Sequence, residues 1–309
     1  MCYSGQLEAA YRRYVRATGA EIDFDQFEEV YGWRAADPAI RIPRAIDRWF
    51  EDPKSAPEQR IRELIDQYRG AMVTKLEAEI FAQRRRLADA ERKLAAKPTR
   101  AATESRRIAG AKIEAALNRL PLFRGWQPTA LDDRIFPFHF APIVMRVEGK
   151  AVVRLARYHC RQAGKPASID RQYPGLYNAR RDNLERFWRR EFGHRHAMML
   201  AASFFENVQR PEGNRVLHFV PRPPETMLIA CLYSEWIDPA GGRGLLSFAA
   251  ITDEPPPEIA AAGHDRCPVN LKPQNIERWL APEGHSAAEL QAILADRQTP
   301  YYEHEVLAA

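Results

Sequence analysis

The sequence predicts an α+β protein, in which a strand-rich core carries a long antiparallel helical hairpin inserted near the N-terminus. Two observations predict this fold. Apolar residues recur at helical spacing through an Ala-, Glu-, Arg- and Lys-rich region of about residues 58–120, and from Pro137 onward short apolar runs alternate with turn residues. We expect residues 1–20 and 135–309 to form the core and residues 21–134 to form the helical insertion.

The helical region divides into two runs at the segment "KPTR", Lys97 to Arg100. Proline disfavours helical backbone at the residue before it, so one long helix is predicted to end here and a second to begin. The two together predict a helical hairpin. Its charged residues form either a solvated face or a surface for a protein partner or DNA.

The core is predicted from strand runs and their turns. "APIVMRV" and "AVVRLARYHC" are joined by "EGK", which is typical of a β-hairpin, and "NRVLHFV", "TMLIACLYSEW" and "GLLSFAAIT" predict further strands. Helical patterns recur at "NLERFWRREF" and at "SAAELQAILAD", where Ser286 and Glu289 have the spacing of a capping box.

Composition limits the class of protein. The 309 residues are 45% hydrophobic, and no apolar run of about 18 residues or secretory signal is seen, so we expect a folded cytoplasmic protein that does not enter a membrane. The four cysteines lack metal-site spacing, and we expect no metal and no organic cofactor. The net charge of +5 permits a polyanionic partner.

The first residues, "MCYSGQ", place a cysteine directly after the initiator methionine. Removal of Met1 would leave Cys2 with an α-amine and a thiol on adjacent carbons, a pair that closes a five-membered thiazolidine ring on an aldehyde. Both groups titrate near neutral pH, the amine at about 8 and the thiol at about 8.5. The alternative is an early residue in a frayed terminus.

Three further segments contain candidate functional residues. "GLYNARRDNLERFW" brings Asn178 and Arg180 together and then interleaves arginines with aromatic residues, which suits a single nucleic-acid strand or an amphipathic helix. In "AASFFENV", Glu206 follows two phenylalanines, and an apolar setting raises a carboxylate pKa; a salt-bridged structural glutamate is the alternative. In "AAGHDRCPVNL", His264 is a proton-transfer or a structural residue.

Taken in order, Cys2, "FAPIV", "YNAR", an aromatic-Phe-Glu segment, "LYSEW", "SFAAIT" and "GHDRCPV" resemble the SRAP family of SOS response-associated peptidases, sensors of abasic sites in single-stranded DNA. The resemblance covers the first few residues and roughly Phe136 to Trp279. About 110 residues of helical insertion separate these two parts.

The resemblance implies a role for each matching residue. Cys2 would bond covalently to the aldehyde of an abasic deoxyribose as a thiazolidine, and Asn178 would position the cysteine amine or the sugar. Glu206 would move protons as the closed sugar opens and the imine forms, with His264 as its partner in ring opening. Arg180 would hold a backbone phosphate. The implied partner is therefore single-stranded DNA that contains abasic sites, and we expect a monomer.

The sequence departs from the family pattern mainly at its DNA-binding positions. Tyr3 and Ser4 replace the usual "GR", Asn207 replaces a tryptophan, and Cys267 replaces a methionine. The family's "WGL-P-W" segment corresponds to "RYHCR". The DNA-binding residues expected here are Arg180, Arg181, Tyr158, His159 and Arg266.

Two other functions stay open. The chain could be a non-catalytic DNA- or protein-binding adaptor with a degenerate SRAP domain, or an N-terminal cysteine amidohydrolase in which the amine of Cys2 serves as base. Glutaminase activity would favour the amidohydrolase, and activity that survives mutation of Cys2 would favour the adaptor.

Overall fold

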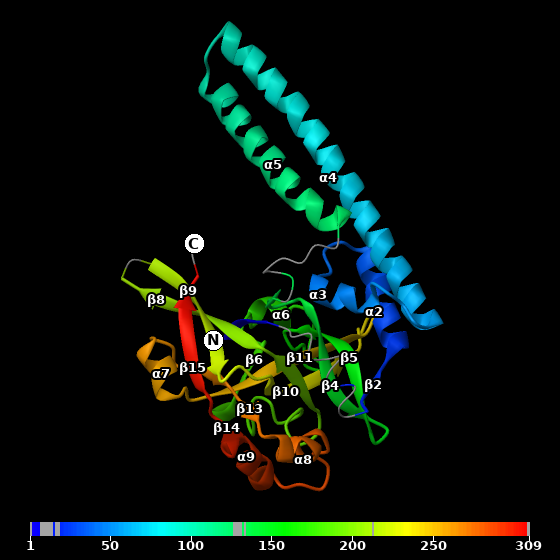
Figure 1. The fold of residues 1–309 in the computed structure, drawn as a ribbon, viewed down its shortest axis with the longest axis vertical. Helices are drawn as coiled ribbons and strands as arrows, with labels where there is room; N and C mark the ends of the chain where they lie inside the picture. The colour runs from blue at the N-terminus through cyan, green and yellow to red at the C-terminus, as the bar shows by residue number, and fades with distance from the viewer. Residues whose placement is uncertain are drawn as a thin grey trace. The chain divides into compact units, whose positions relative to one another are not determined.

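The computed structural model describes residues 15, 19–125, 132, 134–211 and 213–307, together with the backbone of Cys2–Gln6. The chain divides into two compact units (Figure 1). One unit is strand-rich and the other is helical. The strand-rich unit comprises Met1–Phe27, Ile40–Ile46 and Ala130–Ala309, and the helical unit comprises Glu28–Ala39 and Asp47–Thr129.

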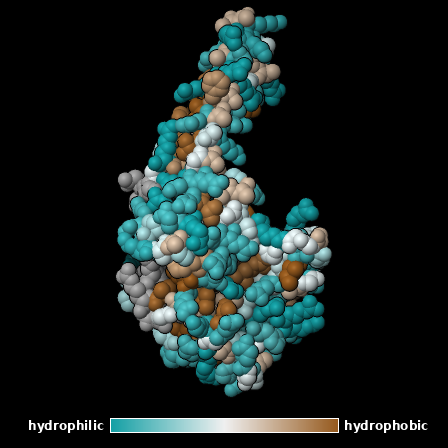
Figure 2. Space-filling model, turned by 90° about the vertical axis from the view of Figure 1, so that its right-hand side faces the viewer, coloured by the Kyte–Doolittle hydropathy of each residue, from teal (hydrophilic) through white to brown (hydrophobic). Residues whose placement is uncertain are grey.

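The helical unit contains the predicted hairpin. Its two long helices are α4 (Ala56–Ala96) and α5 (Arg100–Arg124), and they run antiparallel (Figure 1). Ser55 and Thr99 cap their N-termini, each hydroxyl accepting a hydrogen bond from the backbone N–H three residues on. Between the helices lies a narrow apolar seam formed by Leu76, Ile80, Ala109, Ala116 and Leu120. The face of the hairpin seen in Figure 2 is mostly hydrophilic, with small apolar patches.

Shorter helices flank the hairpin in the chain. They are α2 (Phe24–Ala36), α3 (Arg44–Asp47) and the 3-10 helix η1 (Arg48–Phe50). Just before α2, Glu21–Ile22 form strand β2, which pairs with β5 of the strand-rich unit. Because of this pairing, the strand-rich unit extends further into the chain than the predicted boundary at residue 20.

The strand-rich unit is built around a closed ring of strands. Its members are β4 (Phe140–Val147), β5 (Lys150–Tyr158), β11 (Leu245–Asp253), β10 (Met227–Trp236) and β7 (His196–Ala201). In that order each pairs with the next, and β7 pairs back with β4. Of the five pairs in this ring, only β5–β11 is parallel. The ring is therefore a small barrel filled by buried apolar side chains.

A second sheet continues from the barrel. Only Ala202 separates β7 from β8, so the chain passes directly from the barrel into this sheet. Its strand order is β15 (Tyr301–Val306), β9 (Gly213–Arg222), β8 (Ser203–Arg210), β1 (Cys2–Gln6) and β3 (Arg134–Ile135). The N-terminal strand thus lies inside the sheet, between two neighbours.

Short elements complete the strand-rich unit. They are β6 (Asn178–Arg180), β12 (Cys267–Pro268), β13 (Asn270–Leu271), β14 (Arg297–Gln298), α6 (Ile169–Gln172), α7 (Pro257–Ala261), α8 (Ile276–Leu280), α9 (Ala287–Ala295), η2 (Arg181–Asn183) and η3 (Pro273–Asn275). The described part of the chain has no helix long and apolar enough to cross a membrane.

The structure confirms one predicted core helix and corrects the other. Helix α9 begins with the predicted capping box of Ser286 and Glu289. Residues 184–194, predicted as a helix from "NLERFWRREF", instead form successive turns. The buried amide of Gln162 donates to the carbonyl of Phe187, which a regular helix would bond to the N–H of Glu191.

Candidate active site

The backbone of β1 places Cys2 opposite Glu206 of β8. The two residues are Cα partners in the antiparallel pairing, and the register shifts between Cys2 and Ser4. The predicted nucleophile and the predicted proton-transfer residue therefore share a sheet position, although the side chain of Cys2 itself lies outside the described residues.

Glu206 and His264 form a buried pair. His264 Nε2 lies 3.1 Å from Glu206 Oε2, and the two side chains are 5% and 0% exposed. His264 Nδ1 lies 3.0 Å from the carbonyl oxygen of Arg266 and 3.3 Å from its amide nitrogen, so it can donate to one or accept from the other. Burial lowers the pKa of His264, which favours the neutral imidazole. This pair can pass a proton between the two residues.

The turn that holds His264 depends on the glycine before it. Gly263 has a φ of +91°, a conformation that favours glycine. A Cβ at this position would lie 3.1 Å from Cγ1 of Val208 on β8. The close approach brings the turn against the strand of Glu206, and the N–H of His264 donates to the carbonyl of Ile259 in α7.

Asn178 and Thr252 lie where β6 and β12 flank β11. Asn178 pairs with Ala250, while Thr252 pairs with Arg180 on one side and Pro268 on the other. Among the described residues, Asn178 Oδ1 and Thr252 Oγ1 are buried without a hydrogen-bond partner. Buried polar atoms are usually satisfied, so both can serve a ligand. Sequence reasoning missed Thr252, although it ends the quoted "SFAAIT" segment.

The structure brings Arg180 close to the turn of His264. Its exposed guanidinium binds Asp182 at 2.8 Å. This hydrogen bonding, with a smaller contribution from Asp265, raises the pKa of Arg180. The pKa of Asp182 is lowered chiefly by Arg180 and also by Arg266. The "NAR" segment (residues 178–180) and the "HDR" segment (residues 264–266) therefore lie close enough for their charges to interact.

The other four predicted DNA-binding residues are engaged within the fold, and the mostly buried side chain of Arg266 lies 3.8 Å from Asp265. Arg181 binds Asp253 at 2.8 Å and also donates to Gln291. Tyr158 is 2% exposed and packs on Phe248, and His159 is fully buried. Direct contact of either ring with DNA would require the fold to open, so burial argues against this role. Phe138 stacks on His159 with 4.3 Å between ring centroids, and the ring of Phe138 is exposed where those of Tyr158 and His159 are buried.

The buried thiols are poor nucleophiles. Burial raises the pKa of Cys267 to about 12, with a further contribution from nearby Glu206, and burial also raises the pKa values of Cys160 and Cys231. These three cysteines are free.

A hydrogen-bonded chain of Ser203, His218 and Glu305 has the residue types of a serine-hydrolase triad. His218 Nε2 lies 2.8 Å from Ser203 Oγ, and Nδ1 lies 3.1 Å from Glu305 Oε1. Ser203 is only 2% exposed. The three residues lie on β8, β9 and β15, so their hydrogen bonds tie these strands together. The described residues contain no cluster of three or more His, Cys, Asp or Glu that could hold a metal.

Comparison with solved structures finds distant similarity. A protein from Bacteroides thetaiotaomicron is 17% identical, with a TM-score of 0.49 over 57% of this chain and 78% of that one. A protein from Bordetella bronchiseptica is 16% identical, with a TM-score of 0.48 over 59% and 90%. A phage-related protein from the same organism is 17% identical, with a TM-score of 0.44 over 58% and 82%. No curated protein matches the chain significantly.

Comparison with protein families gives a direct assignment. Residues 121–308, more than half of the chain, match the family described as SOS response associated peptidase (SRAP). The matched region contains Asn178, Glu206 and His264 and excludes most of the helical hairpin. The chain belongs to the SRAP family.

Proposed function

We propose that this chain senses abasic sites in single-stranded DNA and, once Met1 is removed, joins Cys2 to the abasic sugar as a thiazolidine. The observation that carries the proposal is the position of Cys2 opposite Glu206, whose carboxylate contacts His264 in a buried setting. An amine, a thiol and a proton-transfer pair at one position are what such a reaction requires.

The first step is opening of the sugar. An abasic deoxyribose is mostly a closed hemiacetal, so the hydroxyl on C1′ must lose a proton and the ring oxygen must gain one before the aldehyde is available. Glu206 and His264, 3.1 Å apart, can accept and return this proton.

The second step joins the amine to C1′. The α-amine of Cys2 attacks the aldehyde, and loss of one water gives an imine. The buried Oδ1 of Asn178, which has no hydrogen-bond partner among the described residues, can accept a hydrogen bond from this amine or from the sugar. That interaction would orient the nitrogen toward C1′.

The third step traps the imine. The thiol of Cys2 adds to C1′, its proton goes to the nitrogen, and a thiazolidine results. Because C1′ is no longer an imine, the β-elimination that breaks the strand is suppressed. The net change is loss of one water, and Glu206 can protonate the ring in the reverse direction and release the DNA.

Arg180 is the proposed phosphate contact beside the reacting sugar. Its partner Asp182 is 59% exposed, and exposed ion pairs of this kind contribute at most about 1 kcal/mol. A DNA phosphate can therefore replace Asp182 with little loss.

Intact mass spectrometry tests the proposal. The protein is measured alone and after incubation with a single-stranded oligonucleotide that contains one abasic site. We expect a species that lacks Met1 and has gained the oligonucleotide mass minus one water. Cys2→Ser, which keeps the amine and loses the thiol, should give no stable adduct.

Two controls make the result specific. An oligonucleotide with a tetrahydrofuran site, which lacks the aldehyde, should not react. Retention of Met1, or an equal adduct with Cys2→Ser, would contradict the proposal. DNA binding without any adduct would favour the adaptor function instead.

A further inference from the structure

A second feature of the strand-rich unit is a basic pocket between the turns at 184–194 and the loop at 159–173. The pocket has a volume of about 230 Å³. The residues that matter most here are four cations and two aromatic rings: Lys165, Arg186, Arg189, Arg190, Tyr173 and Phe187. No acidic side chain lines it among the described residues.

The four cations of the pocket are available to an anion. Within the described part of the chain, none of Lys165, Arg186, Arg189 and Arg190 forms an ion pair. Other arginines of this unit, such as Arg157 and Arg181, are bound to carboxylates. Unpaired guanidinium groups in a concave site favour phosphate.

The two rings of the pocket offer a stacking surface. Tyr173 is 45% exposed and Phe187 is 36% exposed, and their centroids lie 6.1 Å apart. Exposed rings beside cations are the combination that holds a nucleotide, since the base stacks while the phosphate pairs. The pocket volume suits one nucleotide rather than a longer stretch.

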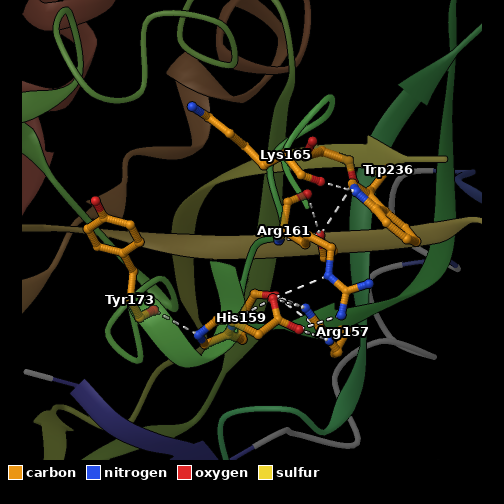
Figure 3. Close-up of polar contacts among 9 residues, drawn as sticks. Arg157, His159, Arg161, Lys165, Tyr173 and Trp236 are labelled. Carbon is orange, nitrogen blue, oxygen red and sulfur yellow. Dashed lines mark hydrogen bonds and ion pairs between the residues drawn. The ribbon is translucent and has the colours of Figure 1, made fainter. Parts of the chain in front are cut away.

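One wall of the pocket is held rigidly by a polar network (Figure 3). Asp170 is clamped between Arg157 at 2.8 Å and Arg161. His159 Nε2 lies 3.2 Å from the carbonyl oxygen of Tyr173, and the indole of Trp236 donates to the carbonyl of Lys165 at 2.6 Å.

The network fixes the backbone and leaves two side chains free to meet a ligand. In Figure 3 the side chains of Lys165 and Tyr173 both extend to the left, away from Arg157 and Trp236. The wall is therefore organised before a ligand arrives, which reduces the entropy lost on binding. Buried His159 does not contact the ligand itself; it holds the backbone of Tyr173 in place through its hydrogen bond to the Tyr173 carbonyl.

The pocket lies on a path that leads from Arg180. Arg186 lines both this pocket and a neighbouring, more open hollow of about 440 Å³ that also includes Arg181 and Asp182. Asp182 is the residue bound by Arg180. Glu185 and Asp253 also line this hollow, and Asp253 is paired with Arg181, so Arg186 is the next unpaired cation for a strand whose phosphate is held at Arg180.

We propose that this pocket binds one nucleotide of the DNA strand that flanks the abasic site, with the base stacked on Tyr173 and its edge against Phe187, whose plane is tilted by 58° from that of Tyr173, and with the phosphates on Arg186, Arg189 and Lys165. The inference rests on the proposed function for its choice of strand. It adds a binding subsite away from the reacting sugar.

Fluorescence anisotropy with an intact oligothymidine, which has no abasic site and cannot crosslink, tests the pocket. We expect Tyr173→Ala to weaken binding at least about fivefold through lost stacking, with the salt dependence unchanged. We expect Arg189→Ala to weaken binding and to reduce the slope of log K against log salt by about 0.7, the value for one phosphate contact with a single strand.

Matched controls exclude general effects. Tyr301→Ala removes another exposed tyrosine on β15, and Arg278→Ala removes another exposed arginine on α8, so neither should change affinity or slope. Each variant should keep the wild-type melting temperature. Wild-type affinity and slope in both pocket variants would overturn the proposal.

The source of the nucleotide is tested in the same assay. Free thymidine monophosphate should not displace the oligonucleotide at concentrations near the DNA Kd. Displacement at such concentrations would show a free-nucleotide site and overturn the assignment to DNA. Because the oligothymidine lacks an abasic site, a failure here leaves crosslinking at Cys2 untouched, and a failure of crosslinking leaves this measurement intact.

Discussion

At the scale of single residues, the candidate site depends on a carboxylate and an imidazole that lie 3.1 Å apart inside the fold. Glu206 is fully buried and His264 is nearly so. Their contact therefore differs from a surface ion pair, which contributes little to stability. The chemistry proposed here needs a group that both takes and gives a proton, and an amide cannot do either.

Glu206→Gln is the sharpest change at this scale. It keeps the shape of the side chain and removes its acid-base capacity, so we expect crosslinking to abasic DNA to be at least about a hundredfold slower. Single-turnover rates from quenched gels measure this effect. Glu225→Gln, an exposed carboxylate before β10, is the matched control and should react at the wild-type rate. A wild-type rate for Glu206→Gln at an unchanged melting temperature would remove Glu206 from the mechanism.

At the scale of elements, short sequence patterns predicted the features that depend on neighbouring residues, such as helix caps and tight turns. Ser286 and Glu289 form the predicted capping box of α9 and "EGK" forms the predicted turn between β4 and β5, because caps and turns depend on a few adjacent residues. Residues 184–194 show the limit of this reasoning. Leu184, Trp188 and Phe192 are buried at helical spacing, yet Gln162, distant in the sequence, takes the carbonyl that a helix would use.

The hairpin seam gives a prediction for these helices. Ala109 is fully buried between α4 and α5, so Ala109→Leu should overpack the seam and cost about 1–3 kcal/mol. Thermal melting followed by far-ultraviolet circular dichroism should show earlier loss of helix. Ala111→Leu, exposed on the same helix, should melt like the wild type.

Crosslinking is the second readout for this variant. Ala109 belongs to the helical unit and Cys2 to the strand-rich unit, so the crosslinking rate of Ala109→Leu should stay unchanged. A large fall in that rate would instead assign the hairpin a part in DNA handling. A protein partner for the hairpin stays a prediction.

At the scale of the whole molecule, the site is assembled from segments that are far apart in the chain. Cys2, Asn178, Glu206 and His264 lie on or beside β1, β6, β8 and β12. Their residue types could be recognised in the sequence. The pairing of β1 with β8, and the meeting of β6 and β12 at β11, could not, because strand partners carry no local signal.

The buried histidines make stability depend on pH. Burial lowers the pKa of His139 to about 4 and that of His196 to about 3, below the ordinary value of 6.5. The unfolded chain therefore binds more protons at acidic pH. Their stabilising contribution is fully present above about pH 6.5 and is lost progressively as pH falls toward 4 and 3, at up to about 1.4 kcal/mol per pH unit for each histidine.

Urea unfolding between about pH 7 and pH 4 measures this dependence. The unfolding midpoint should fall as pH is lowered. His139→Gln should reduce the dependence of unfolding free energy on pH by up to about 1.4 kcal/mol per pH unit, the contribution of one histidine. His304→Gln, an exposed histidine on β15, should leave the slope as it is. A midpoint independent of pH over this range would contradict the lowered pKa values.

The closed barrel also governs when the chain can acquire its fold during synthesis. The ring closes only when β11 lies beside β5, where Ser247 meets Arg157. Strand β2 covers the edge of β5 at Val152 and Val153, but the same edge stays open at Arg157 and Tyr158 until β11 is made, and open edges pair readily with other chains. A nascent chain that stalls before residue 245 therefore exposes a strand edge that the finished fold covers.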